Sequence, residues 1–525
     1  MSDDLHADVI VVGAGIAGSL AAKGLARAGG RVVILEAGPP TDRAQAVQHF
    51  QQSAARVPES AYPDVPYAPR PTVLNLKGYY VQKGPELFAS TYERRIGGTT
   101  WHWLGTSLRL LPNDFRLRST YGRGVDWPIS YAELEPWYGQ AEREIGVSGI
   151  DSPALGAPRS TPYPMPPIPQ SYLDEHFTKA AAKLGLPVTA TPQGRNSVPR
   201  RGRPACCGNA SCIPICPIGA KYDAGVSVAE AKRAGVRVVH SAVVHQVDVR
   251  PGEVRVNYLQ PDGSAHVARG RTLVLAAHAI ETPKLMLLSG LGNGVVGRYL
   301  MDHPTQLSWV LARAPVYPYR GPLSTSGIEV LRDGAFRTQR GAFRVEIGND
   351  GWSWPKGDPT VQAVAQSRNG LGSGPLQDLG KSLARQVRLA SLVEPEPDRE
   401  NRVQLASERD ALGIPRPELS YRTGSYAEDG MAHARRLHGR LFDALGATEI
   451  QHWKGPQGAG HVMGTCRMGD DPRTSVVDRN LRLHGHGNCF VLGSSVFPTV
   501  GTANPTLTIA ALSLRAVEPI RSSLS

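Results

Sequence analysis

The hydrophobic pattern near the start of the chain predicts a strand, a helix and a second strand. Residues 8–12 form an almost continuous apolar, β-branched run, which is typical of a strand buried on both faces of a parallel sheet. A helical segment over residues 19–28 follows, and a second apolar run occupies residues 31–35. This order predicts one βαβ unit of an α/β fold.

The turn of this unit carries the residues of a dinucleotide site. Gly13, Gly15 and Gly18 lie between the first strand and the helix, and Glu36 follows the second strand. Glycines at such a turn let the backbone approach a pyrophosphate at the helix N-terminus, and the acid accepts hydrogen bonds from ribose hydroxyls. The sequence therefore predicts FAD or NAD, because the acid disfavours the 2′-phosphate of NADP.

Farther along, the pattern changes to short alternating segments. Between Pro322 and Gln451, segments such as 360–364 and 402–405 alternate apolar and polar residues, as half-buried antiparallel strands do. The proline-rich stretches 153–169 and 314–322 predict loops, because proline interrupts helices and central strands. We expect a separate sheet domain in this part of the chain.

Composition is that of a globular α/β protein with many turns. The 525 residues are 41% hydrophobic and 20% charged, with 57 glycines, and this length suggests roughly two to four domains. The net charge of +12 comes from scattered basic residues, which favours a solvated surface, or a docking face for an acidic redox partner or anionic lipid, over nucleic-acid binding. The apolar runs are too short for a membrane span, and no Lys or Arg precedes the first strand, so we expect neither a membrane span nor an export signal.

Four of the six cysteines, Cys206, Cys207, Cys212 and Cys216, lie within eleven consecutive positions. Thiolates select zinc, copper(I) or iron–sulfur clusters, and a tight loop closed by Cys-Pro resembles the ligand runs of ferredoxins. We therefore predict an electron-transfer centre. A zinc site is one alternative, although the loop holds adjacent cysteines and no histidine. Disulfides are another, although a chain of this length does not need them.

Motifs spread along the chain together resemble a known family. They are the βαβ unit, a Gly-Gly-Thr segment near residue 100, a strand running into a glycine turn at 488–495, and the run 498–512, in which Asn-Pro-Thr leads into a helix. With them the sequence resembles the glucose-methanol-choline (GMC) oxidoreductases over nearly its whole length. The resemblance implies an α/β fold, with a discontinuous Rossmann-like FAD-binding domain and an α+β substrate domain built on an antiparallel sheet.

The resemblance also implies a division of the chain. We expect an FAD-binding domain over 1–310 with an inserted iron–sulfur loop near 195–222, a substrate-binding domain over 311–454, and a return to the FAD-binding domain over 455–525. The implied cofactor contacts are Gly13, Gly15, Gly18, Glu36, Gly98, Thr99, His102, Val243, Gly493 and Thr502. Some family members attach FAD covalently through a histidine at the spacing of His102, but Trp101 replaces the usual small residue, and the link stays open.

Within the family, the chain most resembles the catalytic subunits of bacterial membrane-associated FAD sugar and polyol dehydrogenases. The motifs that carry this likeness are 97–103, 126–129, 206–217 and 301–304. In that group a 3Fe-4S cluster passes electrons from FAD to a cytochrome c subunit. Three cysteines suffice for such a cluster, so one of Cys206 and Cys207 is free to be a bystander.

The same group works on the periplasmic face of the inner membrane. The resemblance therefore implies that a small partner subunit, bearing a twin-arginine signal, carries the folded chain across. Assembly before export fits the chemistry, because cluster thiols must stay reduced while the cluster forms in the cytoplasm.

Oxidising an alcohol needs a base for the hydroxyl proton, and histidine is the natural base near neutral pH. His461 matches the family's catalytic histidine and Asn504 its partner, although the first could be an ordinary loop histidine and the second a helix cap before Pro505. We expect His303 to stabilise a loop near the site and to be the next candidate base. The remaining histidines are expected to be structural or exposed, including His278, His452 and His484.

Three functions are open at this point. The leading one is a dehydrogenase that oxidises a sugar or polyol hydroxyl with FAD and passes electrons through a 3Fe-4S cluster to a cytochrome. The second is an oxygen-using FAD oxidase with a structural metal site. The third is an electron-transfer subunit without a substrate, against which the pair His461 and Asn504 argues. No motif between 322 and 451 identifies the sugar.

Overall fold

The first apolar run lies at the centre of a five-stranded parallel sheet. β2 (Val9–Val12) pairs with β3 (Val32–Leu35) on one side and with β10 (Thr272–Leu275) on the other. β18 (Cys489–Val491) and β6 (Arg237–Val239) complete the order β18-β10-β2-β3-β6. Strands from the beginning, middle and end of the chain therefore share one sheet, which confirms the discontinuous Rossmann-like domain.

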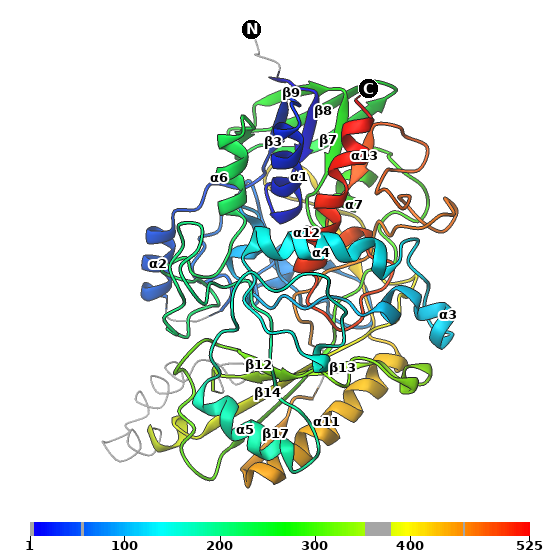
Figure 1. The fold of residues 1–525 in the computed structure, drawn as a ribbon. Coiled ribbons are helices and arrows are strands. Elements are labelled where there is room, and N and C mark those ends of the chain that lie inside the picture. The colour runs from blue at the N-terminus through cyan, green and yellow to red at the C-terminus, as the bar shows by residue number, and fades with distance from the viewer. Residues whose placement is uncertain (1–4, 54–56, 352–379, 455–456, 525) are drawn as a thin grey trace.

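The computed structural model describes residues 5–53, 57–351, 380–454 and 457–524. In Figure 1 the parallel sheet and its helices lie above a second, antiparallel sheet. Within the described residues, no helix combines the length and the apolar character needed to cross a membrane.

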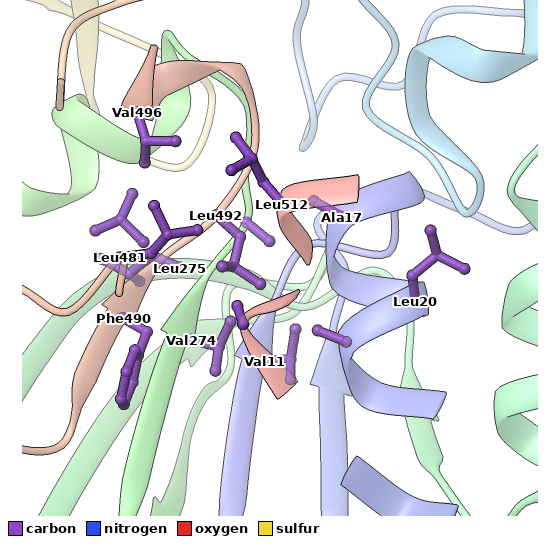
Figure 2. Packing of buried hydrophobic residues seen from close by; sticks show 14 of the residues in the cluster. Val11, Ala17, Leu20, Val274, Leu275, Leu481, Phe490, Leu492, Val496 and Leu512 are labelled. Carbon is purple, nitrogen blue, oxygen red and sulfur yellow. The ribbon is translucent and has the colours of Figure 1, made fainter. Parts of the chain in front are cut away.

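Helix α1 (Ile16–Arg27) covers the parallel sheet near the predicted turn, and helix α12 (Thr506–Arg515) packs beside α1. α1 begins three residues before the predicted helix, directly after Gly15, and α12 forms where the Asn-Pro-Thr motif predicts a helix. Figure 2 shows Val11 and Val274 of the sheet together with Ala17 of α1 and Leu512 of α12. All four side chains are buried, so apolar packing holds the two helices against the core of this domain.

The segment between β6 and β10 forms most of a second, smaller sheet. This sheet consists of β7 (Val243–Arg250), β8 (Glu253–Leu259) and β9 (Ala265–Gly270), which pair antiparallel, with β1 (Leu5–His6) parallel to β9. Val243, the first residue of β7, is one of the predicted cofactor contacts.

The substrate domain is built on a six-stranded antiparallel sheet, as predicted. Its order is β17 (Thr448–His452), β11 (Thr305–Leu311), β14 (Gln386–Val393), β13 (Phe343–Gly348), β12 (Ser326–Ile328) and β5 (Thr189–Ala190). Helices α11 (Ser425–Leu445) and α5 (Tyr172–Ala182) cover one face.

The prediction of half-buried strands is wrong for the centre of this sheet. Every residue of β11, β13 and β14 is buried. One set of alternate side chains, including Val310, Leu389 and Val345, packs against the helices. The other set, including Leu307 and Ala390, lines a cavity between the sheet and the FAD-binding domain. The alternation itself is kept in β13, but its polar residues, such as Arg344 and Glu346, are buried as an ion pair between the two domains instead of facing solvent.

The two segments singled out as strands have different outcomes. Residues 360–364 lie outside the described residues. Residues 402–405 form a strand, β15 (Arg402–Arg409), but it pairs with β16 (Pro415–Ser420) in a three-stranded sheet with β4 (Val81–Gln82). Val403 and Leu419 pack beside Ile280 and Leu300, so this hairpin covers the FAD-binding domain.

The substrate sheet also draws on residues outside 311–454. β11 begins at Thr305, and β5 and α5 come from the first half of the chain. The division of the chain at residues 310 and 454 stays a prediction. These segments lie before residue 311 in the chain but belong to the substrate domain in space.

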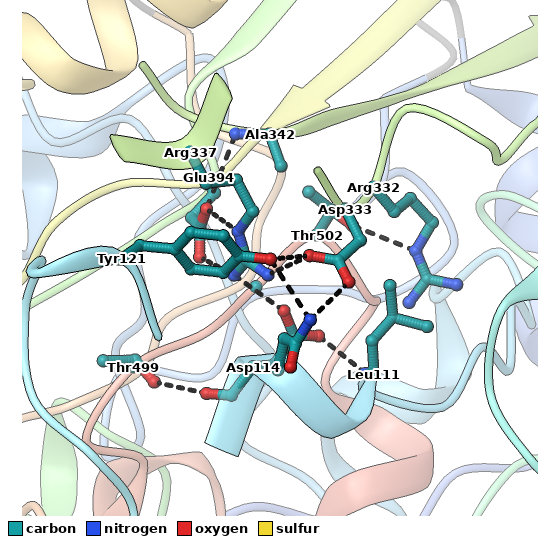
Figure 3. A network of polar contacts seen from close by, with 12 residues as sticks. Leu111, Asp114, Tyr121, Arg332, Asp333, Arg337, Ala342, Glu394, Thr499 and Thr502 are labelled. Carbon is teal, nitrogen blue, oxygen red and sulfur yellow. Dashed lines mark hydrogen bonds and ion pairs between the residues drawn. The ribbon is translucent and has the colours of Figure 1, made fainter. Parts of the chain in front are cut away.

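A buried polar network joins the two domains (Figure 3). The Arg337 guanidinium contacts Asp114 at 2.8 Å and Glu394 at 2.6 Å, and Arg332 donates to the Thr502 hydroxyl at 3.0 Å. All five side chains are buried. Because an unpaired buried charge is strongly destabilising, this network fixes the segment around Thr502, which carries the candidate catalytic Asn504 two residues later.

Candidate active site

The three glycines of the βαβ turn differ in the space around them. Gly13 has φ +107°, and a Cβ there would lie 2.5 Å from the Ala276 oxygen; a Cβ at Gly18 would lie 2.0 Å from the Gly13 oxygen. A Cβ at Gly15 would meet no atom within 4 Å. Gly13 and Gly18 therefore permit close packing of strand, turn and helix, while Gly15 faces open space where a pyrophosphate fits.

Glu36 is held in place for a ribose. Its carboxylate accepts from the backbone N–H of Ala14 at 2.7 Å and of Gly38 at 3.0 Å, and burial raises its pKa. Across the opening, Gly98 approaches Gly15 so closely that a Cβ on Gly98 would lie 3.3 Å from the Gly15 Cα. These contacts form a narrow slot at the end of α1, and they fit the adenosine and pyrophosphate of FAD.

A cavity of about 860 Å³ extends from this slot to the substrate sheet. Its walls include most of the predicted cofactor contacts: Gly13, Gly15, Glu36, Gly98, Thr99, His102, Val243 and Gly493. Gly18 and Thr502 do not line this cavity, and the Thr502 hydroxyl accepts from Arg332.

His102 lines the cavity beside a buried acid. Its Nδ1 lies 3.5 Å from Glu93 Oε1, and Arg70 and Arg95 each contact the other Glu93 oxygen at 2.9 Å. Burial opposes ionisation of Glu93, but the nearby His102 and the two arginines lower its pKa overall. Glu93 therefore carries a negative charge next to the imidazole.

His461 and Asn504 meet at the cavity, as the resemblance implies. Nδ2 of Asn504 lies 3.1 Å from Nε2 of His461, and both residues line the cavity. The alternative role of Asn504 as a helix cap is not observed, since α12 has no side-chain cap hydrogen bond. Its Oδ1 is buried and lacks a hydrogen-bond partner within the described residues.

His303 contacts His461 directly. Its Nδ1 lies 2.9 Å from Nδ1 of His461, and its Nε2 lies 3.0 Å from the Gly501 carbonyl oxygen. A carbonyl only accepts, so Nε2 of a neutral His303 carries the proton and its Nδ1 accepts from His461 Nδ1–H. The lone pair of His461 therefore lies on Nε2, the atom that faces Asn504 and the cavity.

The surroundings keep both imidazoles neutral. Burial lowers the pKa of His461 well below its usual value, and His303 and Arg344 lower it further. Burial also lowers the pKa of His303 to about 4. At neutral pH, His461 is thus an unprotonated base with a fixed tautomer.

Asp302 fixes the backbone of the catalytic loop. Its Oδ1 accepts from the His461 backbone N–H at 2.9 Å, and its other oxygen accepts from the Ser90 hydroxyl. Burial raises the pKa of Asp302 to about 6. The sequence motif Met-Asp-His-Pro thus supplies two supports, one for the backbone and one for the imidazole of His461.

The other histidines are placed away from this pair. Nδ1 of His452 bonds Ser308 at 2.7 Å, and Nε2 of His484 bonds Ser475 at 2.9 Å. His278 stacks on Tyr92 with ring centroids 4.1 Å apart and lines the cofactor part of the cavity.

The cysteine loop packs against the cavity wall. Cys212 and Cys216 are buried, Cys206 is half-buried and Cys207 is exposed. Burial raises the pKa of the Cys206 thiol, with Arg195 opposing and with Cys212 and Cys216 close enough to raise it further. No group of three His, Cys, Asp or Glu side chains within the described ranges is arranged around a single metal ion.

Lys221 connects this loop to the flavin side. Its Nζ donates to the carbonyls of Trp101 at 2.8 Å and Trp103 at 2.5 Å, while its backbone N–H lies 3.5 Å from Cys216 Sγ. Burial lowers the pKa of Lys221 to about 7. Ile213 of the loop itself lines the cavity.

Several lining residues carry no motif. They include Glu93, Glu346, Arg388, Trp453 and Gln457. No signal in the sequence points to them, because tertiary pairing alone brings their segments to the cavity.

Comparisons with known proteins show the family of the chain. Two family models described as GMC oxidoreductase match residues 7–305 and 397–513. The chain is 38% identical to the fructose dehydrogenase large subunit of Gluconobacter japonicus, over 100% of this chain and 99% of that protein. It is 30% identical to the paromamine 6'-oxidase of Streptomyces fradiae, over 99% and 92%. A crystal structure of formate oxidase matches with TM-score 0.68 and 17% identity over 99% of both chains, a likeness of fold alone.

Proposed function

The chain belongs to the GMC oxidoreductase family and is an FAD-dependent oxidoreductase acting on CH–OH groups, and on that basis we propose that it is a sugar or polyol dehydrogenase. The observation that carries the proposal is the fixed tautomer of His461 at the end of a cavity that also holds the FAD slot. The likeness to a fructose dehydrogenase large subunit supports the substrate class.

The residues of the chain divide the work of alcohol oxidation. Nε2 of His461 removes the hydroxyl proton, and the Asn504 amide orients the substrate oxygen against that nitrogen. Nδ1–H of His461 stays bonded to His303, so the imidazole keeps its orientation as it gains charge. Bound FAD supplies the acceptor for the hydride that leaves the carbinol carbon.

We also propose that the cysteine loop holds a 3Fe-4S cluster that delivers electrons to a cytochrome c subunit. Cys206, Cys212 and Cys216 are the proposed ligands, because Cys212 and Cys216 are buried and the half-buried Cys206 thiol lies near both of them. Cys207 is exposed and is the proposed bystander. Arg195 supplies positive charge beside the loop, which favours thiolates.

An oxygen-using oxidase is the second candidate, favoured by the likeness to paromamine 6'-oxidase. A screen of sugars and polyols in air, with an artificial dye present, separates the two. We expect dye reduction to exceed peroxide formation. Peroxide formed as fast as substrate is oxidised would assign the protein to the oxidases.

The pH at which kcat/KM begins to fall should lie below the usual pKa of histidine. His461 must be unprotonated to act, and its pKa is lowered, so the base stays available as the pH falls past about 6.5. We expect kcat/KM for the substrate to stay level from pH 8 to about pH 6 and to fall only at more acidic values. A loss that begins above pH 7 would contradict this assignment of the base.

We further propose that the chain reaches the periplasmic face of the inner membrane with a small partner subunit that bears a twin-arginine signal. Cell fractionation should find the chain in the cytoplasm when it is expressed alone, and dye-linked activity in the periplasm when the partner is co-expressed. Activity that stays cytoplasmic in both strains would refute this route.

A further inference from the structure

One face of the substrate sheet forms the floor of the cavity beyond His461. Three rows of paired residues cross β11, β14 and β13 on this face. Outward from His303, they are Thr305 with Leu392 and Arg344, then Leu307 with Ala390 and Glu346, then Trp309 with Arg388 and Gly348. Successive rows are roughly 7 Å apart, because alternate residues of a strand share a face.

The second row has a polar group at each end and small or apolar side chains between. Glu346 stands at one end and lines the cavity. At the other end, the backbone N–H of Trp453 donates to the Leu307 carbonyl at 2.9 Å, and its side chain packs against the cluster that includes Leu307 and Ala390. Ala390, with its small side chain, leaves room above the middle of the floor.

Two polar atoms on this wall lack hydrogen-bond partners. Within the described residues, Nε1 of Trp453 and Oε1 of Gln457 are buried and unpaired, and both residues line the cavity. Buried polar atoms are normally paired, so each exception needs an explanation. An indole N–H only donates and an amide oxygen only accepts. A substrate hydroxyl can accept from the first and donate to the second.

The charges at this end of the cavity are already paired with one another. Arg388 contacts Asp350 at 2.9 Å and Glu346 at 3.7 Å, and Arg344 contacts the other Glu346 oxygen at 3.3 Å. Among the described residues that line this end of the cavity, the carboxylates of Glu346 and Asp350 face the single guanidinium of Arg388. A carboxylate on the substrate would therefore enter without a free cation, which is costly in a buried site.

We propose that Glu346, Trp453 and Gln457 form a recognition subsite for the remote hydroxyls of a neutral polyhydroxylated substrate, and that this subsite rejects sugar acids. The inference rests on the proposed sugar dehydrogenase function. Glu346 accepts from one hydroxyl, Trp453 Nε1–H donates to another, and the indole face packs on the C–H groups of the sugar. The reacting carbon then lies at His461, about one row closer to the flavin.

The test is anaerobic reduction of the flavin in the FAD-loaded protein by D-fructose, D-glucose, D-sorbitol and D-gluconate at increasing concentrations. For the best neutral substrate, we expect Glu346→Gln and Trp453→Phe each to raise the Kd about tenfold, as loss of a charge-assisted or buried hydrogen bond does. The reduction rate at saturation should change far less. Glu449→Gln, at an exposed position of β17, is the control and should match the wild type.

D-gluconate should reduce the wild-type flavin at least about 100-fold less efficiently than the best neutral substrate, because its charge has no partner. The flavin content of each variant shows whether it is folded. If Glu346→Gln fails to fold, Trp453→Phe still tests the subsite, because it removes no buried charge. An unchanged Kd in Trp453→Phe, or gluconate as good as the neutral sugars, would overturn the subsite. No reduction of the wild type by any of the four compounds would instead reject the proposed function.

Discussion

Replacing His461 with alanine should lower the rate of flavin reduction by substrate roughly 100-fold or more, which is the usual contribution of a positioned acid–base group. FAD should remain bound, because the cofactor slot is built from the glycine turn and Glu36 at the other end of the cavity. The measurement is anaerobic reduction of the flavin at saturating substrate.

His240, which is exposed, provides the matched control, since His240→Ala should keep the wild-type rate. Asn504→Ala should also slow reduction, by a smaller factor, because the base itself remains. Wild-type turnover in His461→Ala at neutral pH would move the search for the base to His303.

Replacing Cys212 or Cys216 with serine should abolish or strongly reduce the content of iron and acid-labile sulfide. Both thiols are buried in the loop, and serine offers no soft ligand in their place. Flavin reduction by substrate should persist because the base and the flavin slot lie outside the loop, while electron delivery to a cytochrome should be slower than in the wild type.

Cys207→Ser is the matched control, because this exposed cysteine is the proposed bystander. It should keep wild-type iron and sulfide. The wild-type protein should be isolated without oxygen. Stoichiometric zinc without sulfide in it would contradict the proposed iron–sulfur cluster and favour a structural zinc site.

The parts of the fold that depend on local pattern were predictable from the sequence. The β-branched run 9–12, the turn glycines and Glu36 form the expected unit because neighbouring residues alone dictate a strand, a tight turn and a helix. The helix after Asn504 forms for the same reason. His461 and Asn504 came from the resemblance, and the structure brings them within hydrogen-bond distance.

Features that depend on pairing between distant segments were not predictable. The strand at 402–409 has the same alternation as a strand of the substrate sheet, yet β16 pairs it with the FAD-binding side. The contact between His303 and His461 joins residues 158 positions apart. Glu346 and Trp453 likewise reach the cavity only through the register of the sheet, which single-sequence periodicity does not specify.

The central claim is that a sugar or polyol hydroxyl reduces the flavin beside His461. Its most direct test is a single anaerobic turnover of the FAD-loaded protein with a neutral sugar, compared with the same sugar deuterated at the reacting carbon. We predict that the oxidised flavin absorption bleaches completely without any added acceptor, and more slowly with the deuterated sugar. A flavin that no sugar or polyol bleaches would contradict the account.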